Sequence, residues 1–217
     1  MTVSTDQEPL DDIEIRAIAA ERLTFFGDAV IAIALTLLAL ELPVPEGATN
    51  AAMLRSALAH REGYQAFMIS FVVIAAHWRA HHRVFRYVTA SNSRVAFLTV
   101  YWLLMLVITP FATGVLNGDG AFQVRFVFYA AVQFGGCVLF MLMDREVRRD
   151  DLYRMGTPPE VFSRAVRRIG IVAAAFLVSV PVAFFTEYAY VCWILVPVID
   201  RIASARRGSQ LRSHGSG

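Results

Sequence analysis

The chain has 217 residues, of which 57% are hydrophobic and 18% are charged. Soluble globular domains carry about 25% charged residues, so this composition excludes that class and indicates a membrane protein. The formal net charge of +2 is too small to indicate a nucleic-acid-binding protein. Both cysteines lie inside apolar segments, so we expect no disulfide framework.

The chain begins with a polar segment, residues 1–21, which contains six acidic residues. This segment lacks the basic start of a cleavable signal peptide, so we expect a cytoplasmic N-terminal arm. The first membrane span is predicted at 23–42, because about 20 apolar residues cross the hydrocarbon core as a helix. Pro43 and Pro45 follow it and end the helix.

Five further apolar segments follow the first span. A short helix at 51–59 is expected at the membrane interface, and the remaining spans are predicted at 64–80, 95–116, 122–143, 169–185 and, shorter than the others, 189–202. The sequence therefore predicts an all-α membrane protein with a six-span domain over residues 22–204. The tail, residues 205–217, is rich in Ser, Gly and Arg and is expected to be disordered.

The arginines predict how the spans are oriented. With the predicted spans, 17 of the 20 basic residues, all of them arginines, fall on the side that holds both termini, and three fall on the other. Because loops rich in Arg and Lys stay in the cytoplasm, both termini are expected to be cytoplasmic. This arrangement agrees with an even number of spans.

Asp28 lies within the first span, where an ionised carboxylate facing lipid costs about 2.5–3.5 kcal/mol. We therefore expect it to face protein. The polar residues at a similar depth lie at the cytoplasmic end of the second span: His77, Trp78, His81 and His82. A polar clasp between the two helices is favoured over a proton relay. Because His77 and His81 share a helix face, a metal site with Asp28 is also conceivable, but no HExxH motif accompanies them.

A stripe of branched apolar side chains follows another face of the first span. At about 100° per residue, Ile33, Leu37 and Leu40 fall within about 60° of one another, whereas Asp28 lies about 140° from Ile33. From the residues alone, such a stripe is most often lipid-facing or packed against protein. Thr36 borders the stripe, and its hydroxyl is most often bonded to its own helix.

Together these residues resemble a known signature. The sequences Arg22-x-x-x-Phe26-Gly27-Asp28 and Ala32-Ile33-x-x-Thr36-Leu37-Leu38-x-Leu40-Glu41-Leu42 resemble the first-helix motif of the transmembrane protein 175 family, the endolysosomal potassium channels and their bacterial relatives. The resemblance continues with Ser70-Phe71, Trp78-x-x-His81-His82 and Pro110-Phe111-x-Thr113. It covers about the first half of the chain. Gly27 stands where the family has serine, which removes a hydroxyl from this motif.

The resemblance implies a homotetramer of six-span subunits in the cell inner (plasma) membrane, with the first helices lining a central pore that passes K⁺. Ile33, Leu37 and Leu40 would form the pore constriction, and the Thr36 hydroxyl would lie near the ion path. The inter-helix network holding the pore helix would comprise Arg22, Phe26, Asp28, Trp78, His81 and His82. Neither a cofactor nor an enzymatic activity is implied; the partners are further copies of the chain and the lipid bilayer, with no nucleic acid.

An apolar constriction offers no ligands to an ion, so permeation requires a water column and dewetting would close the pore. The sequence contains no Thr-Val-Gly-Tyr-Gly filter. The leading alternative is a proton-coupled membrane transporter that uses Asp28 and the second-span histidines as its relay. A metal enzyme embedded in the membrane is a third hypothesis.

Overall fold

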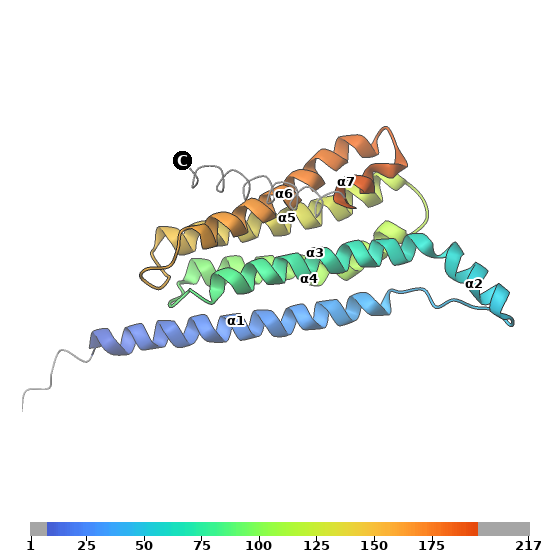
Figure 1. Cartoon of the computed structure of the whole chain (residues 1–217). Helices are drawn as coiled ribbons and strands as arrows, with labels where there is room; N and C mark the ends of the chain where they lie inside the picture. Colours follow the sequence, from blue (N-terminus) through green and yellow to red (C-terminus); the bar gives the residue numbers. More distant parts are fainter. Residues whose placement is uncertain (1–7, 195–217) are drawn as a thin grey trace, which may run out of the picture.

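The computed structural model describes residues 8–194, which form an elongated bundle of helices. In Figure 1 the long helices run side by side, with α1 at one edge, α3 and α4 in the middle, and α5 and α6 at the other edge. The elements are α1 (Glu8–Leu40), α2 (Asn50–Ala59), α3 (Arg61–Phe85), α4 (Ser93–Asn117), α5 (Phe122–Arg149), α6 (Glu160–Ala183), the short 3-10 helix η1 (Glu187–Tyr190) and α7 (Val191–Ile194).

The predicted apolar segments before residue 186 are mainly helical in the structure. The interfacial helix is α2, whose first turn is capped by Thr49: its hydroxyl accepts a hydrogen bond from the Ala52 N–H at 3.2 Å. Helix α1 already begins at Glu8, so most of the segment expected as a polar arm continues directly into the first span. Acidic residues in this first part of the helix suit the positive end of its dipole.

Within residues 8–194, four helices are long and apolar enough to cross a membrane: residues Glu14–Leu40 of α1, and α4, α5 and α6. Helix α3 has 25 residues, which is long enough at about 1.5 Å per residue, but it carries Arg61, Glu62 and the cluster of histidines and arginines near its end. Of the predicted span 189–202, only the start lies within the described residues, as the end of η1 and α7. The tail 205–217 lies outside them.

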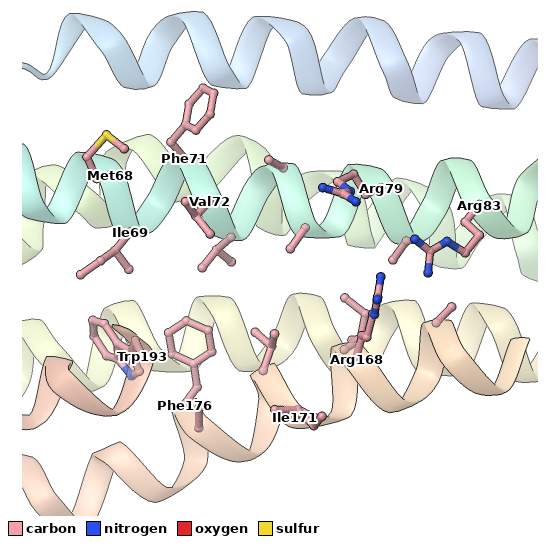
Figure 2. A pocket seen from close by; sticks show the side chains of 18 of the residues that line it. Met68, Ile69, Phe71, Val72, Arg79, Arg83, Arg168, Ile171, Phe176 and Trp193 are labelled. Atoms are coloured by element: carbon pink, nitrogen blue, oxygen red, sulfur yellow. The ribbon is translucent and has the colours of Figure 1, made fainter. Parts of the chain in front are cut away.

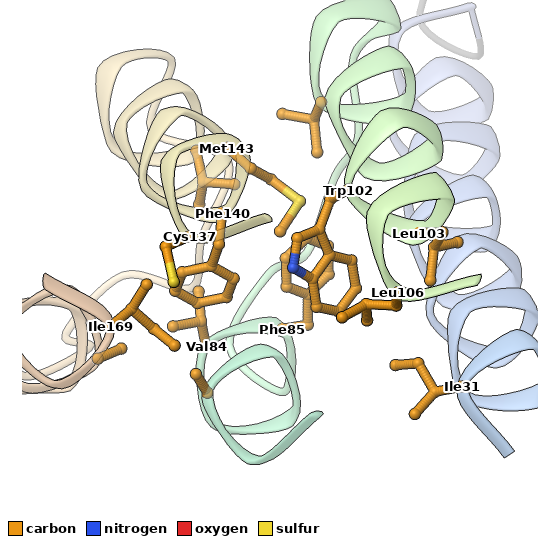
Figure 3. Packing of buried hydrophobic residues seen from close by; sticks show 14 of the residues in the cluster. Ile31, Val84, Phe85, Trp102, Leu103, Leu106, Cys137, Phe140, Met143 and Ile169 are labelled. Atoms are coloured by element: carbon orange, nitrogen blue, oxygen red, sulfur yellow. The ribbon is translucent and has the colours of Figure 1, made fainter. Parts of the chain in front are cut away.

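Large aromatic side chains fill the interior between α3, α4 and α5. Trp102, Phe140 and Met143 are fully buried there, and Phe85 packs beside them. Figure 3 shows these side chains converging from the three helices, with Ile31 of α1 reaching the same cluster from the side. A second cluster joins α5, α6 and α7 through Phe126, Tyr129, Phe176 and Trp193. These two clusters fix the positions of α3 to α6, and α1 packs against α3 and α4.

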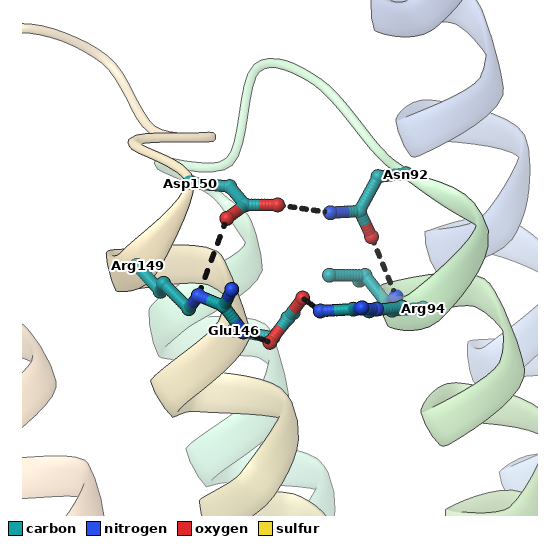
Figure 4. Close-up of polar contacts among 6 residues, drawn as sticks. Asn92, Arg94, Glu146, Arg149 and Asp150 are labelled. Carbon is teal, nitrogen blue, oxygen red and sulfur yellow. Dashed lines mark hydrogen bonds and ion pairs between the residues drawn. The ribbon is translucent and has the colours of Figure 1, made fainter.

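A polar network ties the α3–α4 loop to the end of α5 (Figure 4). Asn92 caps α4, accepting a hydrogen bond from the Val95 N–H at 2.8 Å, and donates another to Asp150 at 2.7 Å. Arg94 pairs with Glu146 at 3.4 Å. Arg149 also approaches Glu146, at 3.8 Å. The network therefore fixes the arginine-rich end of the bundle.

Replacing Asn92 by alanine should destabilise the protein by about 1–2 kcal/mol, because it removes a helix cap and the hydrogen bond to Asp150 together. Thermal unfolding of the purified protein in detergent would measure the change. Ser93→Ala, at the exposed neighbouring position, is the matched control and should leave the unfolding temperature almost unchanged. Equal shifts for the two variants would contradict this role of Asn92.

Candidate functional site

Helix α1 has two distinct faces. One face is buried against α3 and α4 and includes Gly27, Ile31, Ala34 and Leu38, spaced three and four residues apart as one side of a helix requires. Small residues on this face let the helices approach closely. The subunit therefore covers one side of α1 and leaves the other side open.

The predicted constriction residues lie on the open side. Ile33, Leu37 and Leu40 are 58%, 43% and 79% exposed. Thr36 is also exposed, and its hydroxyl donates a hydrogen bond to the Ile33 carbonyl at 2.8 Å, which is the bonding within its own helix that its residue type favours. A helix in a membrane protein that exposes a branched apolar stripe and a hydroxyl away from its own subunit can face lipid, another subunit or a pore.

Asp28 lies between these two faces and is bonded to α3. The Trp78 indole Nε1 donates a hydrogen bond to Asp28 Oδ1 at 3.0 Å. Trp78 in turn stacks on His82, with ring centroids 5.5 Å apart. Of the four α3 residues proposed as partners of Asp28, the structure thus brings Trp78 to it directly and His82 through the stacked ring. We call this set, Asp28, Trp78 and His82, the α1–α3 clasp.

His81 is placed near α1 by packing. It is fully buried and stacks between Phe85 and Trp102, with centroid distances of 3.9 and 4.8 Å. A Cβ on Gly27 would lie 3.8 Å from His81 Cε1, so the ring faces the backbone of α1 at this glycine. Among residues 8–194, neither ring nitrogen of His81 has a hydrogen-bond partner.

The remaining two residues of the predicted network lie away from it within one subunit. Arg22 is exposed and forms no ion pair with any carboxylate in the described part of the chain. Phe26 is also exposed, and because it precedes Ile33 by seven residues it lies on the open face of α1. The grouping of Arg22 and Phe26 with the clasp therefore has no support from contacts inside the subunit.

His77 takes part in a separate set of buried polar contacts, with Trp102 and Cys137, two residues that the sequence did not mark as partners. Trp102 donates its indole N–H to His77 Nδ1 at 3.0 Å. Since indole is only a donor, that nitrogen is unprotonated and the proton is on Nε2, which lies 3.6 Å from the Cys137 sulfur. Both nitrogens of His77 are thereby engaged. The only sequence clue to Trp102 was its place in the apolar span 95–116.

The histidines do not assemble a metal site with Asp28. His77 faces Trp102 and Cys137, whereas Asp28 is bonded to Trp78 on another side of α3. Within residues 8–194, no group of three His, Cys, Asp or Glu side chains lies close enough to hold a metal ion. The arrangement is one of helix packing and hydrogen bonding.

Gly27→Ser should stabilise the protein by about 1 kcal/mol more than the same change at an unconstrained glycine. The reason is that Cε1 lies between the two nitrogens of His81, so a hydroxyl on the new Cβ, 3.8 Å away, can reach one of them. Gly170→Ser on α6 is the control, since nothing lies within 4 Å of a Cβ there and the gain in helix propensity is the same. Equal unfolding temperatures of the two variants in detergent would contradict a bond to His81.

Comparison with known proteins gives a consistent result. A family model described as the endosomal/lysosomal potassium channel TMEM175 matches residues 22–110. The chain is 31% identical over 126 residues to a potassium channel of Streptomyces collinus; this alignment covers 56% of the chain and 61% of that relative. A potassium channel of a Chryseobacterium species is 24% identical over 194 residues, which is 89% of the chain and 98% of the relative.

The fold also matches a solved structure. The crystal structure of a lysosomal potassium-selective channel TMEM175 homolog from Chamaesiphon minutus superimposes with a TM-score of 0.68 at 23% identity. The match covers 83% of the chain and 95% of that protein, and at this identity it establishes the fold. The family match contains the exposed stripe of α1 and the whole clasp, and over residues 22–110 this multi-pass membrane protein is similar to the TMEM175 family.

Proposed function

We propose that this protein is a potassium-permeable cation channel whose pore is lined by α1 and narrowed by Ile33, Leu37 and Leu40. The observation that carries the proposal is the open face of α1: the stripe is exposed within the subunit, although the opposite face of the same helix is buried. The relatives named as potassium channels support K⁺ as the permeant ion.

One subunit cannot enclose a pore with a single exposed helix face. We infer four copies around a common axis, each contributing its α1 and its six spans, with α3 as the second span and the segment from residue 189 as the sixth. The excess of arginines on one side supports an orientation with both termini in the cytoplasm. The membrane is then the cell inner (plasma) membrane.

The constriction would act through water. Leucine and isoleucine side chains provide no oxygen to replace an ion's hydration shell, so an ion crosses with its water or not at all. K⁺ is less strongly hydrated than Na⁺ and would cross at a lower cost, which gives a modest preference. Loss of the water column between the apolar side chains would close the path. The clasp would hold the depth and rotation of α1.

The geometry argues against the alternative, a proton-coupled transporter. A relay needs a continuous chain of hydrogen-bonded groups that can exchange protons. Asp28 is bonded to an indole N–H, which is a donor only and too weak an acid to pass a proton on at neutral pH, and within the described residues His81 has no hydrogen-bond partner. The chain from the carboxylate to the histidines is interrupted at Trp78.

Ion flux into liposomes containing the purified protein tests the proposal. We expect fast K⁺ flux, slower Na⁺ flux and no requirement for a pH gradient. Slow, saturable flux that stops when the pH gradient is removed would favour the transporter instead. Native mass spectrometry of the same preparation would show four copies per complex; a monomer with full K⁺ flux would contradict a shared pore.

A further inference from the structure

A groove with a volume of about 890 Å³ lies between α3 and α6. Figure 2 shows apolar side chains along one end, among them Met68, Phe176 and Trp193. Arg79, Arg83 and Arg168 gather at the opposite end. None of the described residues that line the groove belongs to α1, so it is separate from the proposed pore.

Two arginines at the basic end of the groove, Arg79 and Arg83, lack an acidic partner in the described part of the chain. No described lining residue is acidic. Arg83 also experiences the positive charges of Arg86, Arg164 and Arg168. Arginines held this close together, and partly covered by protein, favour an anion.

The groove lies at a definite depth in the bundle. Its basic end is formed where the last third of α3 meets the first half of α6, at the end that also holds the polar network of Asn92 and Glu146. This is the arginine-rich side of the bundle, which is expected to face the cytoplasm. Its apolar end points toward the middle of the membrane, where Met68 and Val72 are exposed to the surroundings.

We propose that this groove binds an anionic phospholipid of the cytoplasmic leaflet, with the phosphate at Arg79 and Arg83 and an acyl chain along the apolar end. Basic pockets between transmembrane helices on the cytoplasmic side are suited to anionic headgroups. The end of this chain matches the groove less well, since residues 195–217 contain one acidic residue, Asp200, and four arginines. The groove has a charged end and an apolar end, as a phospholipid has a charged headgroup and apolar acyl chains.

The experiment measures binding of phosphatidylglycerol and of phosphatidylcholine to the full-length protein in detergent, by native mass spectrometry. We expect phosphatidylglycerol to bind more tightly, and Arg79→Gln/Arg83→Gln to weaken it at least about tenfold. The matched control is Arg145→Gln/Arg154→Gln, which removes two exposed arginines that do not line the groove. Ala76→Phe adds bulk to the apolar lining between Met68 and Arg79 without changing charge, and it should weaken the binding of both lipids.

Three results would overturn the proposal. The first is equal binding of the two lipids; the second is equal loss in the groove and control variants. The third is tighter phosphatidylglycerol binding by Asp200→Asn, which would show that the end of the chain occupies the basic end. Circular dichroism and gel filtration of each variant identify any that fail to fold, and Ala76→Phe tests the site without the arginines. Lipid binding is measured without ion flux, so its failure is distinct from failure of the channel proposal.

Discussion

Replacing Leu37 by asparagine is expected to raise K⁺ flux through the reconstituted protein several-fold and to reduce its preference for K⁺ over Na⁺. Leu37 is the middle residue of the exposed stripe on α1, between Ile33 and Leu40. An amide in place of the isobutyl group gives water hydrogen-bond partners at the constriction and opposes dewetting. The same change lowers the free-energy barrier that hydrated Na⁺ meets at the apolar ring. Liposome flux with separate K⁺ and Na⁺ gradients measures both effects.

Leu104→Asn provides the matched control for this prediction. Leu104 lies on α4 and is 43% exposed, as is Leu37. The two substitutions should therefore have a similar effect on the stability of the protein. We expect Leu104→Asn to leave the ratio of K⁺ to Na⁺ flux unchanged. If Leu37→Asn also left that ratio and the K⁺ flux unchanged, the stripe on α1 would not be the constriction.

Trp102→Ala is expected to have the largest effect on stability, about 3–5 kcal/mol. The side chain is fully buried, stacks on His81 and contacts Phe140. Its removal leaves a cavity between three helices and takes the hydrogen-bond donor from His77 Nδ1. Lipid is itself apolar, so the loss arises from packing and from the unpaired nitrogen rather than from exposure to water. Thermal unfolding in detergent and the yield of folded protein measure it.

Two further variants separate the causes of this loss. Trp102→Phe keeps an aromatic ring but removes the N–H, so we expect it to cost about 1–3 kcal/mol, mainly from the unsatisfied His77. Leu104→Ala, which truncates an exposed side chain of the same helix, should shift the unfolding temperature little. A Trp102→Ala protein as stable as Leu104→Ala would show that this cluster does not hold the bundle together.

The sequence was sufficient to predict the helices and the two faces of α1. Apolar length predicts spans directly, and the angle between Asp28 and Ile33 follows from helix geometry alone. Few polar residues lie at the same membrane depth as Asp28, so the sequence limits its candidate hydrogen-bond partners to four residues. The choice of Trp78 among the four depends on how α3 is rotated about its axis, and packing against α4 and α5 sets that rotation.

Other features could not be predicted because they depend on contacts between distant segments. Trp102 lies in an apolar span where every residue type suits lipid equally well, so nothing in the pattern marks it as the centre of the interior. The groove between α3 and α6 likewise joins residues about 90 positions apart in the chain. In water, amphipathic periodicity separates the inside from the outside of a helix; within a bilayer both sides are apolar, and that signal weakens.

The hydrogen bond between Asp28 and Trp78 holds α1 at a point far from Leu40. Within residues 8–194, it is the side-chain hydrogen bond that joins this helix to the rest of the subunit, while the backbone connection, residues 41–49, lies beyond the far end of α1. Leu40 is about 18 Å along the helix from Asp28, at about 1.5 Å per residue. Because Ile31, Ala34 and Leu38 are buried between these two points and α1 packs against α3 and α4, a rotation of α3 at Trp78 would carry the buried face and the exposed stripe of α1 together.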